Sequence, residues 1–206
     1  DTMQTTILSL HYLPCLDFFT EWIRADKVLI EAHESFQKQT YRNRCYTLQT
    51  NKKMLLSIPV KKGSQQLNIT DVEIDYKNDW NNLHWRSIKS AYRRTPFFEF
   101  YADEFQEIFE NPPQKLFDFN LKLLTICLEA LGASTDFEQT TAFQHSYPDV
   151  VDLRTAISPK KADRFSYTPY WQVFGNDFIA NLSILDLLFS KGPETKQHLL
   201  QAVLIQ

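Results

Sequence analysis

Polar side chains suited to proton transfer and ligand binding follow two short apolar segments, residues 6–10 (TILSL) and 27–31 (KVLIE). These side chains are His11, Tyr12, Glu31, His33 and Glu34. In open parallel sheets, ligands bind outside the carboxyl ends of strands, and imidazole exchanges protons near neutral pH. We therefore predict that His11 and His33 are catalytic and that Tyr12 and Glu34 bind substrate. Surface or capping roles are the alternative, and a metal site is disfavoured because these residues lack ligand spacing on one element.

The motif Tyr41-Arg42-Asn43-Arg44 lies in a segment, residues 41–48, that reads as a strand. Alternation along a strand would put Arg42 and Arg44 on one side and Asn43 on the other. Two guanidinium groups on one face can grip a phosphate or carboxylate bidentately. Residues 38–94 carry twelve Lys and Arg against four Asp and Glu. We expect all three residues to bind an anionic small molecule, with a solvated basic face as the alternative.

Two further candidates lie on predicted helices. Asp79 is a plausible N-cap for a helix from residue 80 to about 94, which carries His84 as a third catalytic candidate and Trp85 as a wall of the site. A satisfied core histidine is the more common reading of such a position. Asp186 lies on an apolar helix expected over residues 181–190, capped by Asn181, and either reaches a polar pocket or belongs to a narrow solvent stripe.

The elements that must position these residues begin with a helix between the two apolar segments. Its apolar positions are spaced i, i+3, i+4, i+7 and i+8, and they are Cys15, Phe18, Phe19, Trp22 and Ile23. Strand, helix and strand within about 26 residues predict a parallel βαβ unit with a right-handed crossover.

The remainder of the chain predicts further strands at 53–60 and 69–74 and helices at 97–109, 115–131 and from about 194 to the end. Residues 139–170 are poorly periodic, which indicates a functional or a mobile loop. We expect one α/β domain over residues 1–206, with the N-terminal parallel βαβ unit, a mixed sheet and several C-terminal helices.

Missing motifs argue against four classes of protein: classical dinucleotide-binding proteins, P-loop NTPases, α/β-hydrolases and zincins. With four glycines, the chain has no GxGxxG or GxxxxGK[ST] loop, and it has no GxSxG elbow and no HExxH pair. The three cysteines are widely spaced without CxxC, and no apolar run reaches the roughly 18 residues of a membrane span. We expect a cytoplasmic protein with neither nucleic-acid nor membrane partners. The sequence does not identify a cofactor.

Several segments, in order along the chain, resemble the WbqC-like family of bacteria. They are Tyr12-Leu13-Pro14, residues 41–44, residues 57–62 (SIPVKK), His84-Trp85 with Ala91-Tyr92, and residues 181–189 (NLSILDLLF). The resemblance implies a role near surface-polysaccharide biosynthesis and transfer of a small group, such as an aminoacyl or glycyl group, to a sugar. Family members often carry Gln-Pro at Ser9-Leu10, Trp at Cys15 and Gly at Asp17, so these departures imply altered or lost chemistry in this member.

Two hypotheses follow. The first is a transferase acting on an activated sugar or similar anionic donor, with Arg42, Arg44, His11 and His84 converging on one concave site. The second is a non-catalytic ligand-binding or assembly module that forms a homodimer, in which case the C-terminal helices should present a flat apolar patch.

Overall fold

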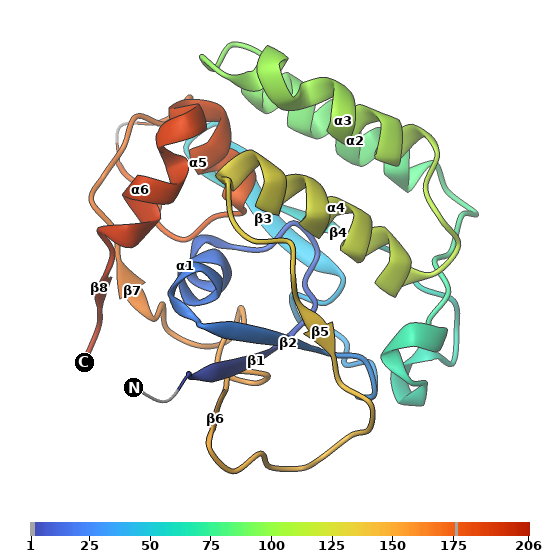
Figure 1. Cartoon of the computed structure of the whole chain (residues 1–206). Coiled ribbons are helices and arrows are strands. Elements are labelled where there is room, and N and C mark those ends of the chain that lie inside the picture. Colours follow the sequence, from blue (N-terminus) through green and yellow to red (C-terminus); the bar gives the residue numbers. More distant parts are fainter. Residues whose placement is uncertain (1–2, 176) are drawn as a thin grey trace.

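The fold is organised around its N-terminal βαβ unit, shown in blue in the computed structural model, which describes residues 3–175 and 177–206 (Figure 1). Strands β1 (Thr5–Ser9) and β2 (Lys27–Glu31) pair in parallel, and helix α1 (Leu16–Arg24) connects them. The apolar face of α1 is directed inward: Phe18, Phe19 and Trp22 are buried and Ile23 is partly buried against the core. The predicted parallel βαβ unit is confirmed.

Two short strands complete this sheet. Strand β5 (Glu138–Gln139) pairs with β2, and β6 (Val150–Asp152) pairs with β1, giving the order β5-β2-β1-β6. All three pairings are parallel. The carboxyl ends of all four strands therefore lie along one edge, which we call the carboxyl edge.

The antiparallel strands form two separate pairs. Strand β3 (Arg44–Gln49) pairs with β4 (Lys52–Ser57), and β7 (Phe165–Ser166) pairs with β8 (Val203–Leu204). The predicted α/β class, with parallel and antiparallel pairing and C-terminal helices, is thus confirmed. The strand predicted over residues 41–48 begins only at Arg44, because residues 41–43 form a turn. Arg42 and Arg44 therefore do not share a strand face.

Three long helices form a layer beside the strands: α2 (Trp80–Tyr92), α3 (Phe98–Glu110) and α4 (Leu116–Leu131) (Figure 1). Their bounds agree with the prediction to within two residues. Helix α4 ends at Gly132, whose φ of 66° lies in the left-handed region that glycine adopts without strain. Short 3₁₀ turns η1 (Ser64–Gln66), η2 (Ile69–Asp71) and η3 (Gly192–Glu194) connect the larger elements. None of the helices in the described part of the chain has the length and apolar character needed to span a bilayer.

Three predicted boundaries are wrong. The strand expected over residues 69–74 is mainly the turn η2, and the helix expected from 194 to the end is α6 (Thr195–Leu200) followed by β8. Asn181 does not cap α5 (Ile184–Lys191), because Ser183 occupies that position. Instead Asn181 adopts a φ of 56°, and its Oδ1 accepts a hydrogen bond from the backbone N–H of Asp17 in the first turn of α1.

Replacing Leu185 should be costly, because its side chain is fully buried on α5. We expect Leu185→Ala to lower the free energy of unfolding by about 2–5 kcal/mol, through lost transfer free energy and the cavity left behind. Urea denaturation measures the change. The matched control is Leu83→Ala, because Leu83 is 54% exposed on α2 and should cost no more than about 0.5 kcal/mol. A loss below about 1 kcal/mol for Leu185→Ala would show that α5 is not part of the core.

Candidate functional site

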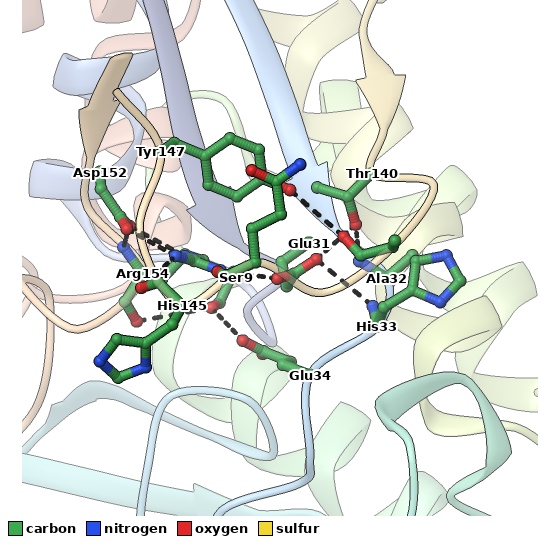
Figure 2. Close-up of polar contacts among 12 residues, drawn as sticks. Ser9, Glu31, Ala32, His33, Glu34, Thr140, His145, Tyr147, Asp152 and Arg154 are labelled. Atoms are coloured by element: carbon green, nitrogen blue, oxygen red, sulfur yellow. Dashed lines mark hydrogen bonds and ion pairs between the residues drawn. The ribbon is translucent and has the colours of Figure 1, made fainter. Parts of the chain in front are cut away.

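Charged and hydroxyl side chains gather at the carboxyl edge (Figure 2). Ser9, Glu31 and Asp152 are the last residues of β1, β2 and β6, so the parallel topology itself brings them together. Arg154 follows β6 by two residues, and Glu34 follows β2 by three. The site is therefore assembled from strand ends far apart in the sequence, as ligand sites of open parallel sheets are.

Arg154 is the most highly connected side chain of this edge. Its Nε and Nη2 donate to the two carboxylate oxygens of Asp152 at 2.9 and 2.6 Å, and its Nη1 donates to Glu31 at 2.8 Å. Nη1 and Nη2 also donate to the backbone carbonyls of Gln144 and His145. Hydrogen bonding to Asp152 raises the pKa of Arg154, and the same contact lowers the pKa of Asp152. All five N–H groups of this guanidinium thus have partners.

A second buried pair lies beside the first. Arg42 Nε and Nη2 donate to Glu34 at 2.6 and 3.0 Å, a bidentate arrangement. Ser9 Oγ donates to Glu34 at 2.7 Å and accepts from Arg42 Nη2 at 3.0 Å. The remaining nitrogen of Arg42, Nη1, has no hydrogen-bond partner among residues 3–175 and 177–206. It therefore keeps two N–H groups for a ligand.

The carboxylate of Glu31 accepts a hydrogen bond from a second side chain besides Arg154. Its carboxylate accepts a short hydrogen bond from the hydroxyl of Thr140, which itself accepts from the backbone N–H of Ala32 at 3.0 Å. The side chains of Glu31, Glu34, Arg42 and Arg154 are all at least nine-tenths buried. Buried ions are tolerated only when such bonds replace the water they lose, so each of these charged side chains depends on its own partners.

A cavity of about 570 Å³ opens onto this network. Arg42, Glu34, Asp152 and Arg154 line it. The exposed side chains of His33, Phe143 and His145 also line it, together with Ser35, Gln37 and Thr155. We call it the carboxyl-edge pocket. It combines charged groups of both signs, two imidazoles and the aromatic ring of Phe143, which is 53% exposed.

Only part of the predicted site lies in this pocket. His33, Glu34 and Arg42 line it, whereas the expected convergence of His11, Arg44 and His84 with Arg42 on one concave surface is wrong. The other predicted substrate-binding residues do not line the pocket either. They are Tyr12, Asn43, Trp85 and Asp186.

The two buried histidines lie in apolar surroundings. His11 packs between the rings of Phe18 and Tyr41, with centroid distances of 5.3 and 5.5 Å, and burial lowers its pKa to about 3. His84 Nδ1 is hydrogen-bonded to the Tyr12 hydroxyl at 2.8 Å, and burial lowers its pKa to about 4. Both imidazoles are therefore neutral at physiological pH, and His11 Nδ1 is buried without a hydrogen-bond partner in the described residues.

The remaining candidates have structural contacts. Trp85 stacks between Phe98 and Phe109, at centroid distances of 5.9 and 5.8 Å. Asn43 Nδ2 donates to the Ile58 carbonyl, and Arg44 Nε is buried without a partner in the described residues. Asp186 accepts hydrogen bonds from three side chains, and burial raises its pKa. The three donors are Tyr92, Tyr170 and Gln172.

Sequence reasoning predicted three of the ten residues that line the pocket. Five of the other seven lie within residues 139–170, which the weak periodicity marked only as a functional or mobile loop: Phe143, His145, Asp152, Arg154 and Thr155. Strand β6 has three residues, too few for a periodic signal. The pairing of β6 with β1 is what turns this irregular segment toward Glu31.

The fold and site define an α/β protein with a mixed-charge pocket at the carboxyl edge of a parallel sheet. The chain belongs to the WbqC-like protein family, whose model matches residues 10–162. The matched region includes Glu31, Glu34, Arg42, Asp152 and Arg154 and thus both ion pairs of the pocket. A search of curated proteins and a search of solved structures both found no match.

The two buried histidines predict a pH dependence of stability. Their folded-state pKa values, about 3 for His11 and about 4 for His84, lie below the value of about 6.5 for an unfolded chain. Unfolding therefore takes up protons below pH 6.5, and the stability present above that pH is lost as pH falls toward 4 and 3. Between pH 6 and 5 the slope should approach about 1.4 kcal/mol per pH unit for each histidine.

Chemical denaturation at a series of pH values measures this slope. His11→Phe should remove about one histidine's share of it, since the phenyl ring can replace the imidazole against Phe18 and Tyr41. Equal pH slopes in wild type and His11→Phe would contradict the neutral, buried state of the His11 imidazole.

Proposed function

We propose that the carboxyl-edge pocket binds a phosphate-linked sugar and that the chain is a transferase acting on this activated donor. The observation that carries the proposal is the Nη1 edge of Arg42, which has two unused N–H groups at a pocket that also contains an exposed aromatic ring. Arginine binds phosphate through such paired N–H groups. Phe143 offers a flat apolar surface to one face of a sugar or base.

The charge of the pocket favours a hydroxyl-rich ligand over a dense polyanion. Glu31, Glu34 and Asp152 outnumber the two arginines, so the network has no formal excess of positive charge. Arg154 has no N–H group left for a ligand. A phosphate would thus be held by hydrogen bonds from Arg42 and from the imidazole of His145, while the pocket's acceptors bind sugar hydroxyls.

The transfer step in this proposal needs a base and a site for the leaving group. The hydroxyl oxygen of the acceptor forms a bond to the donor carbon, and His33 takes the proton from that hydroxyl. The bond from that carbon to the phosphate oxygen breaks, and the electron pair leaves with the phosphate, whose charge Arg42 stabilises. Membership in the WbqC-like family supports placing this reaction in surface-polysaccharide biosynthesis. The three free, buried cysteines support a cytoplasmic location.

A second candidate is a non-catalytic assembly module that forms a homodimer. The observation favouring it is a run of exposed apolar side chains at the C-terminal end of the chain, on and beside β8. They are Leu200, Val203, Leu204 and Ile205. Light scattering distinguishes the candidates, because an assembly module requires a dimer and the transferase proposal does not.

Binding of UDP-glucose, with UMP and glucose as partial ligands, tests the transferase proposal. At about 100 times its dissociation constant, UDP-glucose should stabilise the protein by about 2.7 kcal/mol in thermal unfolding. Phe143→Ala should weaken binding by about 0.5–1.5 kcal/mol, because a stacking surface is lost. Phe100→Ala is the matched control, since Phe100 is 77% exposed on α3 and lies outside the pocket. The proposal fails if UDP-glucose gives no shift, or if Phe143→Ala and Phe100→Ala bind it equally.

A further inference from the structure

The outer wall of the carboxyl-edge pocket is a loop of unusual path, residues 141–149, which connects β5 to β6. These strands occupy opposite ends of the sheet order β5-β2-β1-β6 and run in the same direction. The chain must therefore leave the carboxyl edge at β5, pass the ends of β2 and β1, and return to the amino end of β6 without an intervening helix (Figure 1). Phe143 and His145 of this loop line the pocket.

The loop has little packing of its own. Tyr147 is its only partly buried residue, and the other eight are exposed. Its contacts with the sheet converge on Arg154, which donates to the carbonyls of Gln144 at 2.8 Å and His145 at 3.2 Å. The guanidinium carbon of Arg154 also lies 5.3 Å from the ring centroid of Phe143 and 5.1 Å from that of Tyr147.

Arg154 is anchored independently of the loop. Its bonds to Asp152 and Glu31 hold the guanidinium at the carboxyl edge, and Glu31 is fixed in turn by Thr140. Two backbone carbonyls and two rings of the loop can therefore separate from Arg154 while its ion pairs stay intact. Exposed, locally held loops of this kind open at low free-energy cost.

We propose that residues 141–149 form a lid over the carboxyl-edge pocket and that Arg154 is the positioning residue that latches it closed. The inference rests on the proposed ligand-binding function of the pocket. Arg154 touches no ligand in this account: it places Phe143 against the ligand and His145 at the mouth. Opening of the lid then sets how fast a ligand enters and leaves.

Backbone ¹⁵N relaxation of the ligand-free protein tests the latch. Lysine keeps the charge at position 154 but lacks the forked donors that reach both the carboxylates and the loop carbonyls. In Arg154→Lys we expect order parameters across residues 141–149 to fall from near 0.85 to below about 0.6, while those of β1 stay rigid. The matched control is Arg164→Lys, which removes a similar fork to Glu21 but does not touch the loop. A loop that stays as rigid as in wild type would overturn the proposal.

A second variant, Tyr147→Ala, tests the latch if Arg154→Lys does not fold. Tyr147→Ala removes one ring over the guanidinium and leaves both ion pairs of Arg154 intact. It should lower the order parameters of the same residues by a smaller amount, and unchanged values would also count against the latch.

Stopped-flow measurement of UDP-glucose binding tests separately whether the lid controls access to the pocket. Arg154→Lys should raise both the association and the dissociation rate constants by about threefold or more, which a purely structural role would not do. Equal rate constants in wild type and Arg154→Lys would refute control of access by the lid. Absence of any UDP-glucose binding would refute the proposed ligand, while the relaxation result would still decide the latch.

Discussion

Desolvation of charged groups at the carboxyl edge is the constraint on which the rest of the structure depends. Glu31, Glu34, Arg42 and Arg154 are removed from water, and a buried ion that loses its partner is strongly destabilising. The fold meets this requirement with hydrogen bonds: Arg154 uses all five donors, Arg42 uses Nε and Nη2, and the hydroxyls of Ser9 and Thr140 donate to the carboxylates. Because such a network rarely adds more stability than an apolar core would, its presence beside a cavity of about 570 Å³ points to a functional site.

The parallel topology determines which residues can join this network. With four strands in parallel register, each strand delivers its last residue to the same edge, so Ser9, Glu31 and Asp152 meet without any local sequence motif. The helices supply the apolar core, where aromatic side chains such as Phe18, Trp85 and Phe189 pack. The rigid sheet and helices thereby hold the two ion pairs, while the exposed loop beyond them carries Phe143 and His145 and contacts the sheet through Arg154.

The spacing of apolar residues predicted the helices and strands whose formation depends on local sequence. Helices α1 to α4 and the βαβ unit follow directly from apolar spacing, and the rule for carboxyl ends of parallel strands led to His33 and Glu34. The same rule failed for His11, because Phe18 and Tyr41 enclose it. Arg42 lines the pocket, but not through the strand face that was predicted, since it lies in a turn before β3 and binds Glu34. Strands β5 to β8, of two or three residues, exist only through pairing with distant segments, so no local pattern could reveal them or Arg154.

The central claim is that the charged groups of the carboxyl edge are buried and stable only as pairs, and a double-mutant cycle on Arg42→Met and Glu34→Gln tests it most directly. Arg42→Met alone should cost about 3–5 kcal/mol in urea denaturation, because it leaves the Glu34 carboxylate buried and unpaired. Adding Glu34→Gln should recover much of that loss, with a coupling free energy above about 2 kcal/mol. The same cycle on the exposed Lys27–Glu138 pair of this sheet, with Lys27→Met and Glu138→Gln, should give no more than about 1 kcal/mol. Coupling at Arg42–Glu34 no larger than at Lys27–Glu138 would contradict the account.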